Sequence, residues 1–199
     1  MADTNEHAKK TIYFVRNLYL PQNATDKYKE LFYHYWDEVE QHISELEKKH
    51  KVARIFCESI YMPWEDAMKV LSSMNPKLQQ LMQKRIDSGA IFQPLEDQEI
   101  FGTYVDWNNC MMLVRTASVY EKIFEFFNEA VKKRAKQIKT LLQAEIKDGE
   151  AALIVMRESD LDEIKLGSEF QMVQISTPAY DALLKFIEES RDEKEFWRS

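Results

Sequence analysis

The stretch "YFVRNLYLP" (Tyr13–Pro21) decides how this chain folds, because the chain repeats it further along as "IFCESIYMP" (Ile55–Pro63). In both copies, β-branched and aromatic residues favour a strand, and a Tyr-apolar-Pro connection ends it. A helical pattern follows each copy. A strand followed by a helix, twice over, predicts parallel pairing with right-handed crossovers. We therefore expect the two strands to be parallel neighbours in one sheet.

The rest of the chain continues this alternation of strands and helices. The run "AALIVM" at 151–156 is apolar throughout, which is typical of a central strand covered on both faces. The pair Asn75-Pro76 predicts a break or kink within a helix. The expected strands span 11–20, 52–58, 90–95, 151–156 and 170–176, and the expected helices span 26–50, 64–87, 97–113, 116–147 and 178–189.

These elements predict an α/β fold, built as a three-layer sandwich with a mainly parallel sheet of about five strands and long flanking helices. The chain has 199 residues, of which 45% are hydrophobic, so it can form a sizeable core. We expect a single α/β domain over residues 1–199. A polar N-terminal tail (1–10) and a charged, frayed C-terminal tail (190–199) are expected at its ends.

Composition narrows the classes of function. The chain has only four glycines and no G-x-G-x-x-G or Walker-type run, which argues against a phosphate-binding loop. Its formal net charge of −7 disfavours DNA as a partner. Two cysteines, Cys57 and Cys110, without a C-x-x-C motif, fit a reducing compartment. The N-terminus has no signal-peptide pattern and no apolar run is long enough to span a membrane, so we expect a cytoplasmic protein.

Polar side chains follow the expected strands at their carboxyl ends, where open α/β sheets bind ligands. If the first two strands are neighbours, Arg16 and Glu58 can pair across them. That pair would be either a structural salt bridge or part of a site in which Arg16 orients an anionic group and Glu58 handles a proton. The ligand-binding candidates are Arg16, Asn17, Glu58, Ser59, Glu96, Arg157 and Glu158.

Three of these candidates, Glu58, Glu96 and Glu158, are carboxylates expected at the same edge of the sheet. Gathered there, they could bind Mg²⁺ through water or do acid–base chemistry. The alternative is that they are ordinary solvated residues after strands. The sequence identifies no cofactor and no catalytic residue.

A row of imidazoles and a carboxylate lies on the first long helix. His34, Glu38 and His42 are spaced by four residues and therefore share one stripe of the helix. Such side chains are ligands for Zn²⁺ or Fe²⁺. The outer two lie about 12 Å apart along the helix, at ~1.5 Å per residue, so one ion cannot contact all three. They are weak metal candidates, and a solvated stripe with helix ion pairs is the favoured interpretation.

The segment "KKRAKQIK" (Lys132–Lys139) is the one basic cluster, and it lies in an expected helix. Lys132, Lys136 and Lys139 share a face and are the partner-binding candidates. This face could contact an acidic partner, RNA phosphates or an anionic surface, or it could simply be solvated. No aromatic residues are interleaved with it, so base stacking is not indicated.

From the basic helix through "GEAALIVM" to "VQISTPAYDALLKFI", the last third of the chain resembles the terminal α/β domains of archaeal-type release factors. The resemblance implies an RNA- or ribosome-associated protein. The Gly-Gly-Gln tripeptide of release factors is absent, because the chain contains no Gly-Gly. No residue roles are therefore transferred.

Our leading hypothesis is a noncatalytic binding or accessory protein that contacts another macromolecule through its long helices. The partner would be another protein or a second copy of the chain, not a membrane. This hypothesis follows from the lack of a recognisable nucleophile–base pair, phosphate loop or metal motif. The alternative is a small-molecule or metal-dependent enzyme with its site at the carboxyl ends of the strands. Association with RNA or the ribosome is the second alternative.

Overall fold

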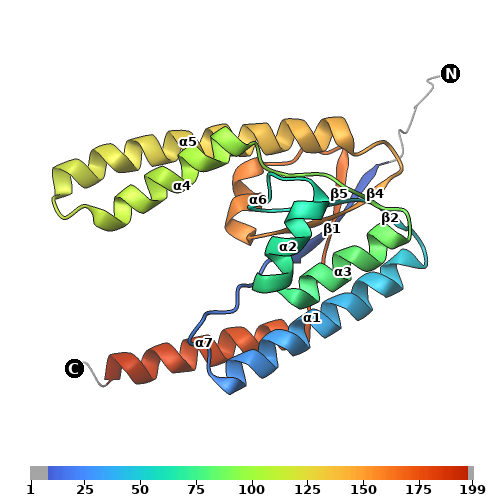
Figure 1. The fold of residues 1–199 in the computed structure, drawn as a ribbon, viewed down its shortest axis with the longest axis horizontal. Helices are drawn as coiled ribbons and strands as arrows, with labels where there is room; N and C mark the ends of the chain where they lie inside the picture. Colours follow the sequence, from blue (N-terminus) through green and yellow to red (C-terminus); the bar gives the residue numbers. More distant parts are fainter. Residues whose placement is uncertain (1–8, 197–199) are drawn as a thin grey trace.

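The computed structural model describes residues 9–196 and shows one sheet of five parallel strands between two layers of helices (Figure 1). This confirms the predicted three-layer α/β sandwich. The strands are β1 (Lys10–Arg16), β2 (Val52–Cys57), β3 (Ile91–Phe92), β4 (Ala151–Met156) and β5 (Phe170–Gln174), and the helices are α1 (Asp26–Glu47), α2 (Trp64–Met74), α3 (Pro76–Asp87), α4 (Gln98–Leu113), α5 (Ala117–Glu145), α6 (Glu158–Ile164) and α7 (Pro178–Phe196).

Alternate residues of the strands face the two helical layers. Tyr13 and Val15 of β1 pack in the core formed with α1, α2, α3 and α7. Ile12 and Phe14 point the other way, into the core formed with α5 and α6. This alternation is the two-residue period of a strand, and apolar residues at every position allow both faces to be buried.

The central strand is β4, in the spatial order β3-β2-β4-β1-β5. All six of its residues are buried, as the uninterrupted apolar run predicts. The expectation that β1 and β2 are neighbours is wrong, although they are parallel. β4 lies between them and pairs with both. A helix between two strands predicts that the strands are parallel. It does not predict whether a strand from later in the chain, here β4, lies between them.

This order explains the repeated phrase. Phe14 of β1 and Phe56 of β2 are both in register with Ile154 of β4, one on each side. Both phenylalanines are buried in the core that faces α5 and α6. The two copies are therefore similar because two strands pack against the same neighbour at the same height.

Short polar side chains fix where several helices begin. Thr25 accepts a hydrogen bond from the Tyr28 backbone N–H at the start of α1. Asn75 does the same for Leu78, so the chain ends α2 and restarts as α3 at Pro76, as expected for a break there. Asp97 caps α4.

The element boundaries differ from the sequence prediction in several places. β3 covers only Ile91–Phe92 of the expected strand 90–95. β1 ends at Arg16 and not near residue 20, and the short helix α6 was not predicted at all. α7 continues to Phe196, although a frayed tail was expected from residue 190. The remainder of that tail (197–199) and most of the expected N-terminal tail (1–8) lie outside the described residues.

The long helix α5 is buried along only half of its length. Its buried residues begin at Ala130, whereas Val119 and Phe126, which its periodicity places in the core, are exposed. α4, which packs on this half of α5, has no buried residue. We call residues 98–129, α4 and the first half of α5, the arm. Figure 1 shows the arm extending past α6, away from the sheet.

Within residues 9–196, none of the helices combines the length and the apolar character that crossing a membrane requires.

The shared packing of the two phenylalanines can be tested by truncation. Phe14→Ala and Phe56→Ala should each lower the free energy of unfolding by about 3–5 kcal/mol, because each leaves a cavity beside the central strand. Met172→Ala, on the exposed side of the edge strand β5, is the control and should lower the free energy of unfolding by much less than either phenylalanine change. Urea unfolding measures all three. Equal losses at positions 14, 56 and 172 would contradict this account of the core.

Candidate functional site

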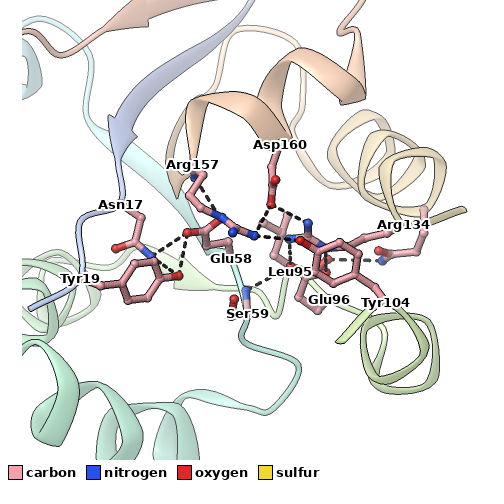
Figure 2. Close-up of polar contacts among 11 residues, drawn as sticks. Asn17, Tyr19, Glu58, Ser59, Leu95, Glu96, Tyr104, Arg134, Arg157 and Asp160 are labelled. Carbon is pink, nitrogen blue, oxygen red and sulfur yellow. Dashed lines mark hydrogen bonds and ion pairs between the residues drawn. The ribbon is translucent and has the colours of Figure 1, made fainter. Parts of the chain in front are cut away.

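Polar side chains meet beyond the carboxyl ends of the strands and form one continuous set of hydrogen bonds and ion pairs, which we call the strand-end network (Figure 2). Five of the seven ligand-binding candidates belong to it. Its members are Asn17, Tyr19, Glu58, Ser59, Glu96, Tyr104, Arg134, Arg157 and Asp160.

Glu58, directly after β2, is the centre of one half of the network. Its side chain is fully buried. Oε1 accepts hydrogen bonds from the Asn17 amide at 3.0 Å and from the Tyr19 hydroxyl at 2.8 Å. Oε2 accepts one from the backbone N–H of Arg157 at 2.9 Å. Burial, reinforced by the Glu58 carboxylate, raises the pKa of Tyr19, so its hydroxyl stays a hydrogen-bond donor.

Arg134 on α5 is the centre of the other half. Its Nε and Nη2 donate to the two oxygens of Glu96 at 2.9 and 2.5 Å, and its Nη1 donates to Asp160 at 2.6 Å. Burial of the guanidinium works against its charge, but the two carboxylates outweigh this and raise the pKa of Arg134. Glu96 also accepts the backbone N–H of Ser59, which has a left-handed φ of 64°. A non-glycine residue rarely adopts this conformation, so the network holds a strained turn.

Arg157 joins the two halves. Its Nε lies 3.5 Å from Glu58, and its Nη2 donates to the Tyr104 hydroxyl at 3.2 Å and to Asp160 at 3.0 Å. Burial lowers the pKa of Arg157, but Glu58 and Asp160 raise it by more. The side chain is 43% exposed. It borders a cleft of about 350 Å³ that is also lined by residues of α4, α5 and α6, including Phe127.

The expected pair between Arg16 and Glu58 is wrong. Arg16 instead donates to Glu158, from Nε at 2.8 Å and from Nη2 at 3.1 Å, and its guanidinium lies 4.5 Å from the ring centre of Tyr180. The hydrogen bond from Arg16 lowers the pKa of Glu158. The cause is again the strand order. β4 lies between β1 and β2 and so separates Arg16 from Glu58. Glu158 follows two residues after the end of β4, the strand that pairs with β1, and is therefore close to Arg16.

The carboxylates do not all meet. Glu58 and Glu96 belong to the strand-end network, while Glu158 pairs outside it with Arg16 and Gln174. Both buried carboxylates have cationic or hydrogen-bonding partners, so they are held as acceptors. Acid–base chemistry by these residues would require their present partners to move.

Four members of the network, Tyr19, Tyr104, Arg134 and Asp160, are not among the candidates taken from the sequence. Arg134 had a detectable signal, because it occupies an apolar-stripe position four residues from both Ala130 and Ile138, where a charged residue needs a buried partner. Asp160 had no comparable signal in the sequence, because it lies on α6, which is too short to show a clear hydrophobic periodicity.

The three weak metal candidates lie along α1, apart from the strand-end network. His34 Nε2 is 3.2 Å from Glu38, and the other oxygen of Glu38 accepts the backbone N–H of Ala179 at 2.8 Å. Glu38 therefore connects α1 to the first turn of α7. No group of three or more potential ligands among the described residues could hold a metal ion, and His42 only lines an open groove on α1.

The basic face of α5 is exposed at Lys132 and Lys136. Lys139 is partly covered and donates to the Lys165 carbonyl at 2.6 Å.

Cys57 is buried in β2, and burial raises the pKa of its thiol, so it is a poor nucleophile.

Comparison with protein-family models, with curated proteins and with solved structures found no match, and so gives no support to the resemblance of the last third to release factors.

The two arginine sites should differ in their contribution to stability. Arg134→Met leaves the buried Glu96 without its cation and leaves Asp160 paired with Arg157 alone, and breaking a buried pair of this kind costs about 3–5 kcal/mol. Arg16→Met is the matched control, because its partner Glu158 is half exposed and such a pair contributes only ~0–1 kcal/mol. Chemical denaturation of both variants measures the difference. Equal losses would show that the network is not specially dependent on Arg134.

The lowered pKa of Glu158 has a consequence for pH dependence. Because the pKa is lower in the folded than in the unfolded chain, this interaction stabilises the fold above the unfolded value of 4.5 and is lost as pH falls through the folded value. Arg16→Met should raise the Glu158 pKa towards that ordinary value. An NMR titration of the side-chain carboxyl measures it, and an unchanged pKa in the variant would refute the pairing with Arg16.

Proposed function

We propose that this chain is a noncatalytic binding protein that contacts another protein through its arm. The observation that carries the proposal is the environment of α4. Only Glu99 and Asp106 are charged among its 16 residues, yet none of the 16 is buried. A helix with so little charge is normally covered on more than one side. Within the described chain α4 has α5 as its main neighbour, so part of its surface is left for a partner.

The tip of the arm carries the most exposed apolar side chains. Met112 is 72% exposed and Leu113 is 79% exposed. Protein interfaces are enriched in aromatic residues and methionine and depleted in charge at their centres, and exposed apolar patches mark such interfaces. Four further apolar residues of the arm are exposed: Val119, Tyr120, Phe124 and Phe126.

The charge of the arm favours a protein over a nucleic acid or an anionic membrane. Residues 98–129 contain five acidic residues and only two basic ones, Arg115 and Lys122. Phosphate backbones and anionic headgroups are bound through clusters of lysine and arginine. The apolar tip has no such cluster beside it.

A photo-crosslinking residue tests this proposal. Placed at Leu113 in the full chain, in cells that produce it, it should give a covalent adduct with another polypeptide. Placed at Ser72, an exposed residue of α2, it should give none. The adduct should disappear when Val119→Glu and Phe124→Glu are added, while far-UV circular dichroism should show that the fold is kept, because neither side chain is buried in the core. Absence of an adduct, or equal adducts at both positions, would refute docking through the arm.

A small-molecule site is the second candidate, and the cleft beside Arg157 favours it. Its volume of about 350 Å³ falls in the range of ligand pockets, and it lies at the carboxyl edge of the sheet. The part-exposed guanidinium of Arg157 suits a small organic anion. An enzyme with this fold would place its substrate at the same edge.

A thermal-shift screen with anionic metabolites tests the second candidate. An anion that raises the melting temperature of the parent chain should lose its effect in Arg157→Gln. It should keep its effect in Arg16→Gln, because Arg16 does not line the cleft. A screen in which no anion shifts the melting temperature, or in which Arg157→Gln responds like the parent, would remove this candidate.

A further inference from the structure

The charged residues on the outer face of α5 form a two-part pattern. Glu121, Glu125, Lys132 and Lys136 lie within an arc of about 60°, at roughly 100° per residue, and all four are exposed. The two acidic residues lie on the arm, and the two basic residues lie on the half of α5 that packs on the sheet. We call these four residues the charged stripe.

The charged stripe is free to pair with another molecule. Glu121, Lys132 and Lys136 have no side-chain partner within the described part of the chain. Among the described residues, Glu125 forms an ion pair only with Lys122, one turn away, at 2.6 Å. Both of those side chains are exposed, and an exposed pair of this type contributes only ~0–1 kcal/mol, so it can be exchanged for another.

The charges of the stripe are complementary to those of a second, antiparallel copy of the same helix. Glu121 and Lys136 are equally distant from the point between residues 128 and 129, and so are Glu125 and Lys132. A two-fold axis at that point would set two copies of α5 antiparallel. Each Glu121 would then face a Lys136, and each Glu125 a Lys132, which gives four ion pairs. A parallel arrangement would oppose like charges.

We infer that the partner of the arm is a second copy of this chain, bound through antiparallel contact of the two α5 helices. This inference rests on the proposed function, since it names the protein that the arm binds. It also assigns the acidic partner of Lys132 and Lys136, which is the outer half of the same helix in the other copy.

Two aromatic residues of the arm, Phe124 and Tyr120, lie about 60° and 100° round α5 from Glu121, at roughly 100° per residue. Tyr120 and Phe124 stack with ring centres 6.1 Å apart, and both are close to half exposed. Val131, two turns along from Phe124, lies on the same side of the helix and lines the cleft beside Arg157. Beyond Val131 this side of α5 packs on the sheet through Ile138 and Leu142. The contact between the two copies is therefore made by the charged stripe, whose charges set its orientation.

Charge reversal followed by mixing tests the inference with the purified full chain. Sedimentation equilibrium should show a dimer for the parent. The double variants E121K/E125K and K132E/K136E should each dimerise at least about tenfold more weakly, because like charges then meet. An equimolar mixture of the two should form a heterodimer, and one chain carrying all four changes should again form a homodimer. The recovery on mixing excludes loss of folding as the cause.

A control carries the same change of charge elsewhere. E188K/E189K on α7 should dimerise like the parent, because both residues are exposed and distant in sequence from the stripe. A parent chain that stays monomeric at about 0.1 mM, or a dimer that survives both reversals, would overturn the inference. A monomeric parent that still gives an adduct at position 113 with a different polypeptide would overturn it and leave the proposed function standing.

Discussion

Burial of β4 on both faces is the constraint on which the rest of the structure depends. Its six residues are removed from solvent, so helices must cover the sheet on both sides and other strands must pair at both edges. β1 and β2 supply those edges, with Phe14 and Phe56 at the same height against Ile154. The carboxyl ends of the three strands therefore converge on one place, which is where the strand-end network forms.

The strand-end network connects the sheet to the arm. The guanidinium of Arg134 lies on α5 just where this helix leaves the core, and it contacts Glu96, in the connection after β3, and Asp160, on α6. The rings of Phe101 and Tyr104 on α4 lie 5.6 and 4.8 Å from the same guanidinium. Buried charges cost desolvation, which their mutual hydrogen bonds offset only in one geometry. The network therefore ties the base of the arm to the sheet, and the cleft beside Arg157 lies at this junction.

Helix α5 has two roles along one continuous length. Its second half buries Ala135, Ile138 and Leu142 against the sheet, while its first half presents apolar and acidic residues to the exterior. In the antiparallel pairing that we propose, the acidic half of each α5 would face the basic half of the other copy.

Features that depend on neighbouring residues could be predicted from the sequence. Period-two and period-3.6 patterns defined the strands and long helices, the run 151–156 identified the central strand, and Asn75-Pro76 marked the break between α2 and α3. Strand ends were located well enough to bring five of the seven candidate residues into one network. Only the tertiary structure decided the strand order, and with it the partner of Arg16, because pairing between distant segments leaves no local pattern. It also decided that Val119 and Phe126 are exposed. Periodicity shows which face of a helix is apolar, but the surface that covers this face belongs to another part of the fold or to another molecule.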